Sequence, residues 1–404
     1  MNWPGLLRWA AVASAAGCFS PELKDGVIPC GEAGCPDGME CAADGYCYRD
    51  APGEGPDGSP GGGGGSGEGS TAVFAVGNSG EPSRVYAHCG DDRFVSVWTA
   101  PSTRSTEAVA WGDADGDRVA ELAVAGSGDA LELFRFSGGD LSLAWSSEGA
   151  VDGTELAWAD QDGDGKEDLA LGRLGAPLEV YAWTGEGLAV RSHAPWSDDV
   201  SAIGWADRDG DGALDIAQSE RTDDSVVFAL IGGEMEARWS SEQIESTESL
   251  AWADVDGDGD PDLAVGNDGQ PNRLYRNDDG FLVSAWSATI TTSTRSVAWA
   301  DYDGDGDPDL AVGSDGHPNL VYQNDDGTLV VAWTAADTEP TRALAWVDYD
   351  GDGDPDLAVG NKGAASRIYR NDGGALSPVW TAPVPETTTS LSWGRWPGVP
   401  AACR

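Results

Sequence analysis

Acidic loops recur along the chain at a constant interval, and their residue types suit the binding of a hard metal cation. The clearest copy, residues 254–262, reads Asp-Val-Asp-Gly-Asp-Gly-Asp-Pro-Asp, with carboxylates at positions 1, 3, 5 and 9. Calcium prefers about six to eight oxygen ligands in flexible geometry, which these carboxylates and a backbone carbonyl at position 7 would supply. Glycine at positions 4 and 6 permits the tight turn. Because the carboxylates would repel one another without a cation, the loops predict calcium sites.

An EF-hand also opens with Asp-x-Asp-x-Asp-Gly, but it needs flanking helices and a Glu at position 12. Here position 12 is Val265, the flanking segments have strand-like composition, and Pro261 lies inside the loop. An EF-hand is therefore excluded.

The loops begin 47 residues apart, which makes each of them part of a repeated structural unit. They start at Asp113, Asp160, Asp207, Asp254, Asp301 and Asp348. In the unit around the clearest loop, short apolar runs at 248–252, 262–266, 273–276 and 281–286 alternate with turn-forming residues. Four short strands without helical periodicity predict one blade of an all-β propeller.

The two ends of the repeat region each carry part of a further blade. Residues 72–98 match the second to fourth strands of a unit, and residues 390–393 match a first strand. Together they would form a seventh blade and close the ring, so we expect a seven-bladed β-propeller over residues 71–404. Cys89 and Cys403 flank this closure and would pin the ends as a disulfide; two unpaired cysteines are the alternative.

Aromatic residues follow the same interval. Trp stands two residues before each loop and again at Trp393, and a second Trp column and a Phe/Tyr column lie on the other strands. The second Trp column is Trp98, Trp145, Trp239, Trp286, Trp333 and Trp380. Because nearly every repeat has an aromatic residue at the same positions, we expect these side chains to pack between blades. The alternative is that they form platforms on which sugars stack.

The run Asp-x-Asp-Gly-Asp-Gly-Asp-Pro-Asp-Leu-Ala-Val-Gly at 254–266, 301–313 and 348–360 resembles the FG-GAP or VCBS repeats of integrin-α-type proteins. The resemblance covers 71–404 and implies a seven-bladed propeller that binds up to six Ca²⁺ ions on one face. The first loop departs from the pattern at Arg118, where Gly is expected, and the seventh blade has no loop. By resemblance the ligands are Asp113, Asp115, Asp117 and Glu121; Asp160, Asp162, Asp164 and Asp168; Asp207, Asp209, Asp211 and Asp215; Asp254, Asp256, Asp258 and Asp262; Asp301, Asp303, Asp305 and Asp309; Asp348, Asp350, Asp352 and Asp356.

The N-terminal residues have the composition of an export signal. Residues 1–17 contain Arg8, an apolar stretch and then small residues, which predicts a signal peptide. The sequence Ala-Ala-Gly-Cys ending at Cys18 resembles a bacterial lipobox, although Ala15 stands where Leu is usual. We therefore expect lipidation of Cys18, with ordinary signal cleavage as the alternative.

Between this signal and the repeats lie a cysteine-rich segment and a linker. Residues 18–50 predict a small two-disulfide module of undetermined pairing; a zinc site is the alternative, but no Cys-x-x-Cys pair is present. Its cysteines are Cys30, Cys35, Cys41 and Cys47. Residues 51–70 are rich in Gly and Pro, which predicts a flexible linker.

Charge and composition limit the function classes. A formal charge of −47, from 70 acidic and 23 basic residues, argues against nucleic acid and anionic lipid as partners. No apolar run is long enough to span a membrane. His88, His193 and His317 stand at unrelated repeat positions, and no nucleophile motif or phosphate-binding loop is present, so we expect no enzyme activity.

We expect an exported, lipid-anchored protein of the outer membrane or cell surface; a secreted or periplasmic location is the alternative. Its propeller would mediate binding or adhesion to a protein or cell-surface partner, with a glycan-binding lectin or a purely structural envelope protein as alternatives. The loops between blades, at 99–106, 146–153 and 334–341, vary while the blades do not. This variation favours a ligand on the face opposite the calcium loops, although unconstrained surface loops would vary too.

Overall fold

The structure, a computed structural model, describes residues 28–29, 40–41, 46–48, 70–196, 199–325 and 327–404. Ser70–Arg404 belong to one compact unit and Ser20–Gly69 form another. In the second unit, β1 (Ile28–Pro29), β2 (Glu40–Cys41) and β3 (Tyr46–Tyr48) pair in the order β1-β3-β2. The predicted signal peptide, the predicted lipidation site Cys18, the cysteine pairing of the module and most of the linker lie outside the described residues.

The described residues of 70–404 form β-strands and one short 3-10 helix, η1 (Ala401–Cys403). Five antiparallel sheets each take four consecutive strands. These are blade 1, β7 (Thr106–Gly112), β8 (Glu121–Gly126), β9 (Ala130–Ser137) and β10 (Asp140–Ala150); blade 2, β11 (Gly153–Ala159), β12 (Asp168–Arg173), β13 (Glu179–Trp183) and β14 (Leu188–His193); blade 3, β15 (Val200–Ala206), β16 (Asp215–Glu220), β17 (Val226–Ile231) and β18 (Glu234–Ser240); blade 4, β19 (Thr247–Ala253), β20 (Asp262–Asn267), β21 (Arg273–Asp278) and β22 (Phe281–Ser287); and blade 5, β23 (Thr294–Ala300), β24 (Asp309–Ser314), β25 (Leu320–Asp325) and β26 (Thr328–Thr334).

The eight remaining strands of 70–404 form one sheet, which divides into two sets of four where β28 pairs with β31. The first set, blade 6, is β27 (Thr341–Val347), β28 (Asp356–Ala364), β29 (Arg367–Asn371) and β30 (Leu376–Thr381). The second, the closing blade, is β31 (Glu386–Trp396), β4 (Thr71–Asn78), β5 (Arg84–His88) and β6 (Phe94–Thr99).

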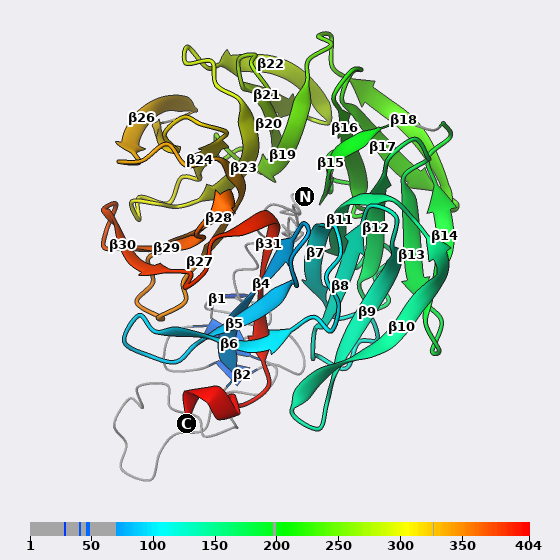
Figure 1. Cartoon of the computed structure of the whole chain (residues 1–404). Helices are drawn as coiled ribbons and strands as arrows, with labels where there is room; N and C mark the ends of the chain where they lie inside the picture. The colour runs from blue at the N-terminus through cyan, green and yellow to red at the C-terminus, as the bar shows by residue number, and fades with distance from the viewer. Residues whose placement is uncertain (1–27, 30–39, 42–45, 49–69, 197–198, 326) are drawn as a thin grey trace. The chain divides into compact units, whose positions relative to one another are not determined.

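The blades surround a common centre (Figure 1), with the first strand of each blade innermost. Each first strand lies against the first strand of the next blade, and β31 lies against β7, which completes the ring. In the closing blade β31 pairs with β4, from Trp396 opposite Thr71 to Thr388 opposite Asn78. A disulfide joins Cys89 to Cys403. The all-β propeller, its closure from both chain ends and this disulfide are confirmed.

Burial explains why the inner and outer strands differ in sequence. The second strand of a blade, such as β20, is buried along its whole length because the neighbouring blades cover both of its faces. The outermost strand β22 buries only Leu282, leaves Trp286 half-buried and exposes its other residues. Continuous apolar runs in the inner strands and mixed apolar and polar residues in the outer strand are therefore the sequence signature of this architecture.

The predicted Trp columns do pack between blades, and the inner column has a polar role as well. Trp252 contributes to a core cluster with Ala217 and Val227 of the preceding blade, and its indole Nε1 donates to the carbonyl of Gly204 there, at 3.3 Å. The same bond joins Trp158 to Ala110, Trp205 to Ala157, Trp299 to Ala251, Trp346 to Ala298 and Trp393 to Ala345. This bond explains why the column is Trp rather than Phe.

Candidate metal centre

The six acidic loops, loop 1 to loop 6 in chain order, each join the first strand of a blade to the second, and their own carboxylates fold them. In every loop the position-1 Asp accepts the N–H of position 6, as Asp254 Oδ2 does from Gly259 at 3.0 Å. The position-5 Asp accepts the N–H of position 7, as Asp258 does from Asp260 at 3.0 Å. Gly257 and Gly259 have φ of 71° and 98°, whereas Arg118 must adopt the left-handed φ of 71° in loop 1.

Three of the four predicted ligands converge in each of loops 1 to 5, where they place oxygens within 4.8 Å of one another. In loops 1, 4 and 5 the converging residues are at positions 1, 3 and 9, and in loops 2 and 3 they are at positions 1, 3 and 5. The groups are Asp113, Asp115 and Glu121; Asp160, Asp162 and Asp164; Asp207, Asp209 and Asp211; Asp254, Asp256 and Asp262; Asp301, Asp303 and Asp309. The fourth predicted ligand of each of these loops lies outside its group: Asp117, Asp168, Asp215, Asp258 and Asp305.

The position-9 carboxylate opens the second strand and is buried. Both oxygens of Asp262 accept backbone N–H groups, from Asn277 at 2.7 Å and Val255 at 2.9 Å. Asp309 and Asp356 are held in the same way in loops 5 and 6. Burial, and to a lesser extent the neighbouring carboxylates, raise the pKa of Asp262 to about 7 and that of Asp356 to about 8. A bound cation would favour the ionised form of both.

Three asparagines connect these loops across blades: Asn277, Asn324 and Asn371. The sequence indicated them only as turn-forming residues. The side chain of Asn277 donates to the carbonyl of Pro261 in its own blade at 3.0 Å and to that of Arg208 in the preceding loop at 2.8 Å. Asn324 donates to Val255, and Asn371 to Tyr302, each at 2.7 Å. The recurrence of Asn at the 47-residue interval was the available sequence signal.

The donor set of loop 4 fits a calcium ion. Asp254 Oδ1 and Asp256 Oδ1 are buried and have no hydrogen-bond partner within the described residues. A buried carboxylate oxygen without a partner is costly. Calcium takes oxygen donors of this kind, so Asp254, Asp256 and Asp262 would hold it.

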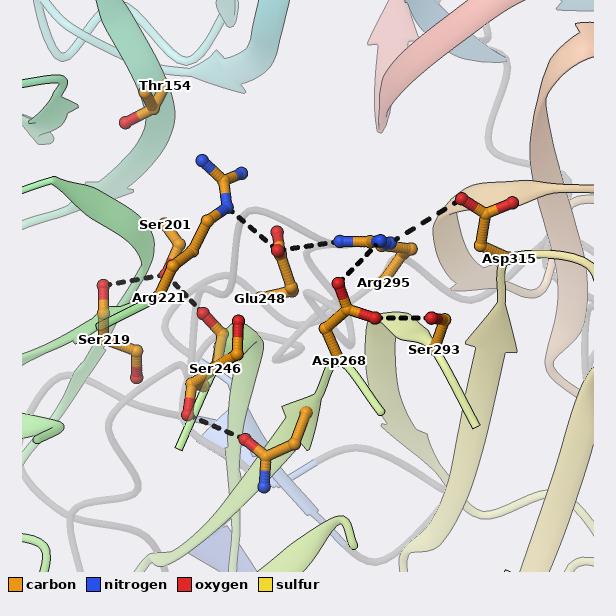
Figure 2. A network of polar contacts seen from close by, with 12 residues as sticks. Thr154, Ser201, Ser219, Arg221, Ser246, Glu248, Asp268, Ser293, Arg295 and Asp315 are labelled. Atoms are coloured by element: carbon orange, nitrogen blue, oxygen red, sulfur yellow. Dashed lines mark hydrogen bonds and ion pairs between the residues drawn. The ribbon is translucent and has the colours of Figure 1, made fainter. Parts of the chain in front are cut away.

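At the opposite ends of the first strands, ion pairs join consecutive blades (Figure 2). Glu248 Oε1 contacts Arg221 of blade 3 at 2.9 Å and Arg295 of blade 5 at 2.7 Å. Arg295 also contacts Asp268 of blade 4 at 2.9 Å, and Asp315 at 3.9 Å. The charges in this network already have partners, which leaves it little capacity to bind a charged ligand.

The first strands surround a small hollow beside this network, lined in part by Glu155, Leu250 and Arg342. A water-sized molecule has about 30 Å³ available there, room for about two waters. Glu155 stands where the other repeats carry Ala or Ser, and it has no ion pair among the described residues. Burial raises the pKa of Glu155 to about 8.

Large apolar side chains are exposed on the loops around this same face. Ile244, Ile290 and Val384 lie between the fourth strand of one blade and the first strand of the next, and Ile244 is 66% exposed. Trp196 occupies the equivalent region after β14 and is 42% exposed. None of the large apolar side chains exposed in the described residues lies in the six acidic loops.

Three overlapping segments, residues 254–312, 301–359 and 348–399, match the FG-GAP-like repeat family. No curated protein matches the chain. Among the described residues, no helix has the length and apolar character needed to cross a membrane.

Solved structures resemble the chain in fold. One of them is described as a 6-phosphogluconolactonase from Bacteroides uniformis. It has a TM-score of 0.60 and 12% sequence identity, and the match covers 80% of this chain and 99% of that chain. Sqt1 of Saccharomyces cerevisiae has a TM-score of 0.57 and 13% identity over 79% of this chain and 84% of its own. BBS1N in complex with ARL6DN has a TM-score of 0.57 and 15% identity, and the match covers 75% of this chain and 89% of that chain. At these identities the likeness shows the fold alone.

Proposed function

Because the chain is a β-propeller built on FG-GAP-like repeats, a fold consistent with protein binding or a structural role, we propose that it is a non-enzymatic, calcium-binding surface protein. Its propeller binds a protein or cell-surface partner, and calcium stiffens the blades that present the binding face. Export and anchoring through lipidated Cys18 would place the propeller at the cell surface.

One observation carries the calcium proposal: among the described residues, buried oxygens of Asp254 and Asp256 have no hydrogen-bond partner, in a loop that backbone hydrogen bonds already hold in shape. Loop 5 repeats this hydrogen-bonded shape. Calcium would satisfy these oxygens and offset the repulsion between the carboxylates.

The partner face is supported by the exposed apolar side chains. Ile244, Ile290, Val384 and Trp196 all project from the rim opposite the acidic loops. Exposed apolar residues beside variable loops are typical of protein contact surfaces. BBS1N, which shares the fold, was solved in complex with ARL6DN.

A lectin is the second candidate, and Trp196 favours it because an exposed Trp can stack on a sugar ring. The two candidates differ in their response to Trp196→Ala: this change would abolish a glycan-array signal but only weaken protein binding, in which the aliphatic rim residues share.

Thermal unfolding of the full chain tests the calcium role. Millimolar calcium is expected to raise Tm, because a site occupied at a hundredfold excess over Kd contributes about 2.7 kcal/mol. Chelator should reverse the shift, and magnesium should reproduce it poorly because it demands stricter geometry. An unchanged Tm would contradict calcium binding by the loops.

Binding to arrays of surface proteins and of glycans tests the partner role, with the double variant Ile244→Ser, Val384→Ser compared with wild type. Saturable binding that the double variant loses would support the rim as the contact surface. The control Phe281→Ser, on the outer strand β22, removes an exposed apolar side chain elsewhere and should leave binding intact. Equal loss in both variants would contradict the rim.

A further inference from the structure

In loops 1 to 3 an arginine bridges the carboxylates at positions 3 and 9. Arg191 Nη1 contacts Asp162 at 2.6 Å and Asp168 at 3.4 Å in loop 2. Arg208 contacts Asp209 at 3.0 Å and Asp215 at 3.2 Å in loop 3. In loop 1, Arg135 contacts Glu121 at 3.1 Å and also pairs with Asp115. The positive charge in each case lies where a cation would join the two carboxylates.

The three arginines reach this place from different parts of the fold. Arg135 comes from the third strand β9 and lies over the ring of Trp183, 5.2 Å from its centroid. Arg191 comes from the fourth strand β14. Arg208 belongs to loop 3 itself, is only 7% exposed, and also donates to the carbonyl of Gly280. Packing and hydrogen bonds therefore hold at least two of these guanidinium groups in position.

Loops 4 to 6 lack this bridge. Their position-9 carboxylates each accept two backbone N–H groups instead, whereas Glu121 of loop 1 accepts one. Arg276, at the repeat position of Arg135, contacts only Asp256 in loop 4, at 2.8 Å. Gln323 is uncharged at that position in loop 5, and Arg370 in blade 6 turns to Asp92 of the closing blade, at 2.9 Å.

Other positions divide the loops in the same way. Position 7 is Val119, Lys166 or Ala213 in loops 1 to 3, and Lys166 pairs with Asp164 at 2.9 Å. In loops 4 to 6 position 7 is a fifth acidic residue: Asp260, Asp307 or Asp354. The cross-blade asparagines also occur only in blades 4 to 6, at positions that blades 1 to 3 fill with Phe136, Trp183 and Leu230.

The position-9 carboxylate is outside the converging group in two of the three bridged loops, loops 2 and 3, but inside it in loop 1. In loops 2 and 3 the position-9 residues Asp168 and Asp215 lie outside the converging group, whereas in loops 4 and 5 the position-9 residue belongs to it. In loops 2 and 3 the guanidinium that pairs with position 9 thus removes one oxygen ligand from the group, and in all three bridged loops its charge repels an approaching divalent ion.

We propose, building on the proposed calcium function, that loops 4, 5 and 6 take calcium, while Arg135, Arg191 and Arg208 serve as built-in counter-ions that keep loops 1 to 3 free of it. The propeller then consists of a calcium-dependent half, blades 4 to 6, and a calcium-independent half, blades 1 to 3.

Calorimetric titration of calcium into the chelator-treated full chain measures the number of sites. We expect about three ions in the wild type. Asp301→Asn in loop 5 should lower the number by about one, while the matched Asp160→Asn in loop 2 should leave it unchanged. Arg191→Ala should raise it by about one. Arg238→Ala is its control, because Arg238 stands at the same position of the next blade but pairs with Glu236 at 3.0 Å.

The outcomes separate this proposal from the function on which it rests. Absence of any binding would contradict the calcium function itself. About six ions in the wild type, a loss of one ion in Asp160→Asn, or no gain in Arg191→Ala would each overturn the division while leaving calcium binding intact. Should Asp301→Asn fail to fold, anomalous scattering from calcium in crystals of the wild-type chain locates the ions directly: peaks in loops 4 to 6 alone support the proposal, and peaks in loops 1 to 3 overturn it.

Discussion

The inner Trp column shows how one polar atom on an apolar side chain orders the propeller. Each indole packs between two blades. Its N–H donates a hydrogen bond to a strand carbonyl of the preceding blade, which holds the two blades in register. Trp111 is the exception, since its Nε1 is buried without a partner in the described residues. The blade that precedes it is the closing blade, where Ser392 Oγ instead accepts the backbone N–H of Trp111 at 3.2 Å.

This contrast predicts unequal effects from the same substitution. Trp346→Phe loses ring volume and the bond to Ala298, so we expect its free energy of unfolding to fall by about 2–4 kcal/mol. Trp111→Phe loses similar volume but removes an unpartnered buried N–H, so its loss should be smaller by about 1–2 kcal/mol. Denaturant unfolding of both variants measures the difference, and equal losses would contradict a stabilising role for the indole bond.

Glu155 lines the central hollow without an ion pair among the described residues, and its titration gives a second prediction at this scale. Burial raises its pKa from the ordinary 4.5 to about 8, so the folded chain binds this proton more tightly than the unfolded chain. The unfolding free energy attributable to Glu155 is therefore highest below about pH 4.5 and falls as the pH rises to about 8. Glu155→Gln should equal the wild type near pH 4 and exceed it near pH 8.5.

Unfolding in denaturant at these two pH values, in the presence of calcium, provides the measurement. The comparison at low pH is an internal control, because both side chains are then uncharged. A stability advantage of Glu155→Gln that is the same at both pH values would indicate a packing effect rather than a titration.

At the scale of elements, the loop of one blade and the hairpin of the next act together. The side chain of Asn324 donates to Val255 in loop 4 at 2.7 Å, its backbone N–H donates to Asp309 at 2.7 Å, and its Oδ1 accepts from Gly327 at 2.9 Å. This side chain thus transmits the shape of one acidic loop to the neighbouring blade.

Asn324→Ala should therefore weaken both stability and calcium binding. Loss of the cross-blade bond leaves the buried carbonyl of Val255 without this donor, and we expect about 1–2 kcal/mol less stability. Because Val255 adjoins Asp254 and Asp256, the calcium affinity of loop 4 should fall as well. Titration calorimetry and denaturant unfolding measure the two effects. Asn272→Ala, which alters a turn on the other face, should change stability but not affinity.

Periodic features could be read from the sequence, and features that depend on neighbouring blades could not. The strands, the loops, the closure and the disulfide follow from a fixed 47-residue interval and from where it begins and ends. The bridging arginines carry no such signal, because Arg135, Arg191 and Arg208 occupy three different positions within the repeat. Only the folded ring shows that all three reach the same pair of carboxylates.

At the scale of the whole molecule, the closing blade differs from blades 4 to 6. Those blades have an acidic loop and an asparagine, and in their place the closing blade has a disulfide. Arg395 stands at the position of the first loop Asp, and Cys89 stands at the position of Asn277, Asn324 and Asn371. The disulfide from Cys89 to Cys403 thus joins the third strand of this blade to the segment that replaces the loop. We therefore expect the ring to remain closed when its cation sites are empty.

Calcium and the disulfide should therefore stabilise the ring by separate means. We expect the double variant Cys89→Ser, Cys403→Ser to lose about 2–5 kcal/mol of unfolding free energy, since the bond closes a loop with a sequence separation of 314. Its calcium stoichiometry should equal that of the wild type, because no proposed ligand lies in the closing blade. Denaturant unfolding with calcium and with chelator, for both proteins, completes a double cycle of four measurements. The two losses should add if closure and cation binding are independent. A loss in chelator that exceeds their sum by more than about 1 kcal/mol would show instead that calcium in blades 4 to 6 holds the ring shut when the bond is absent.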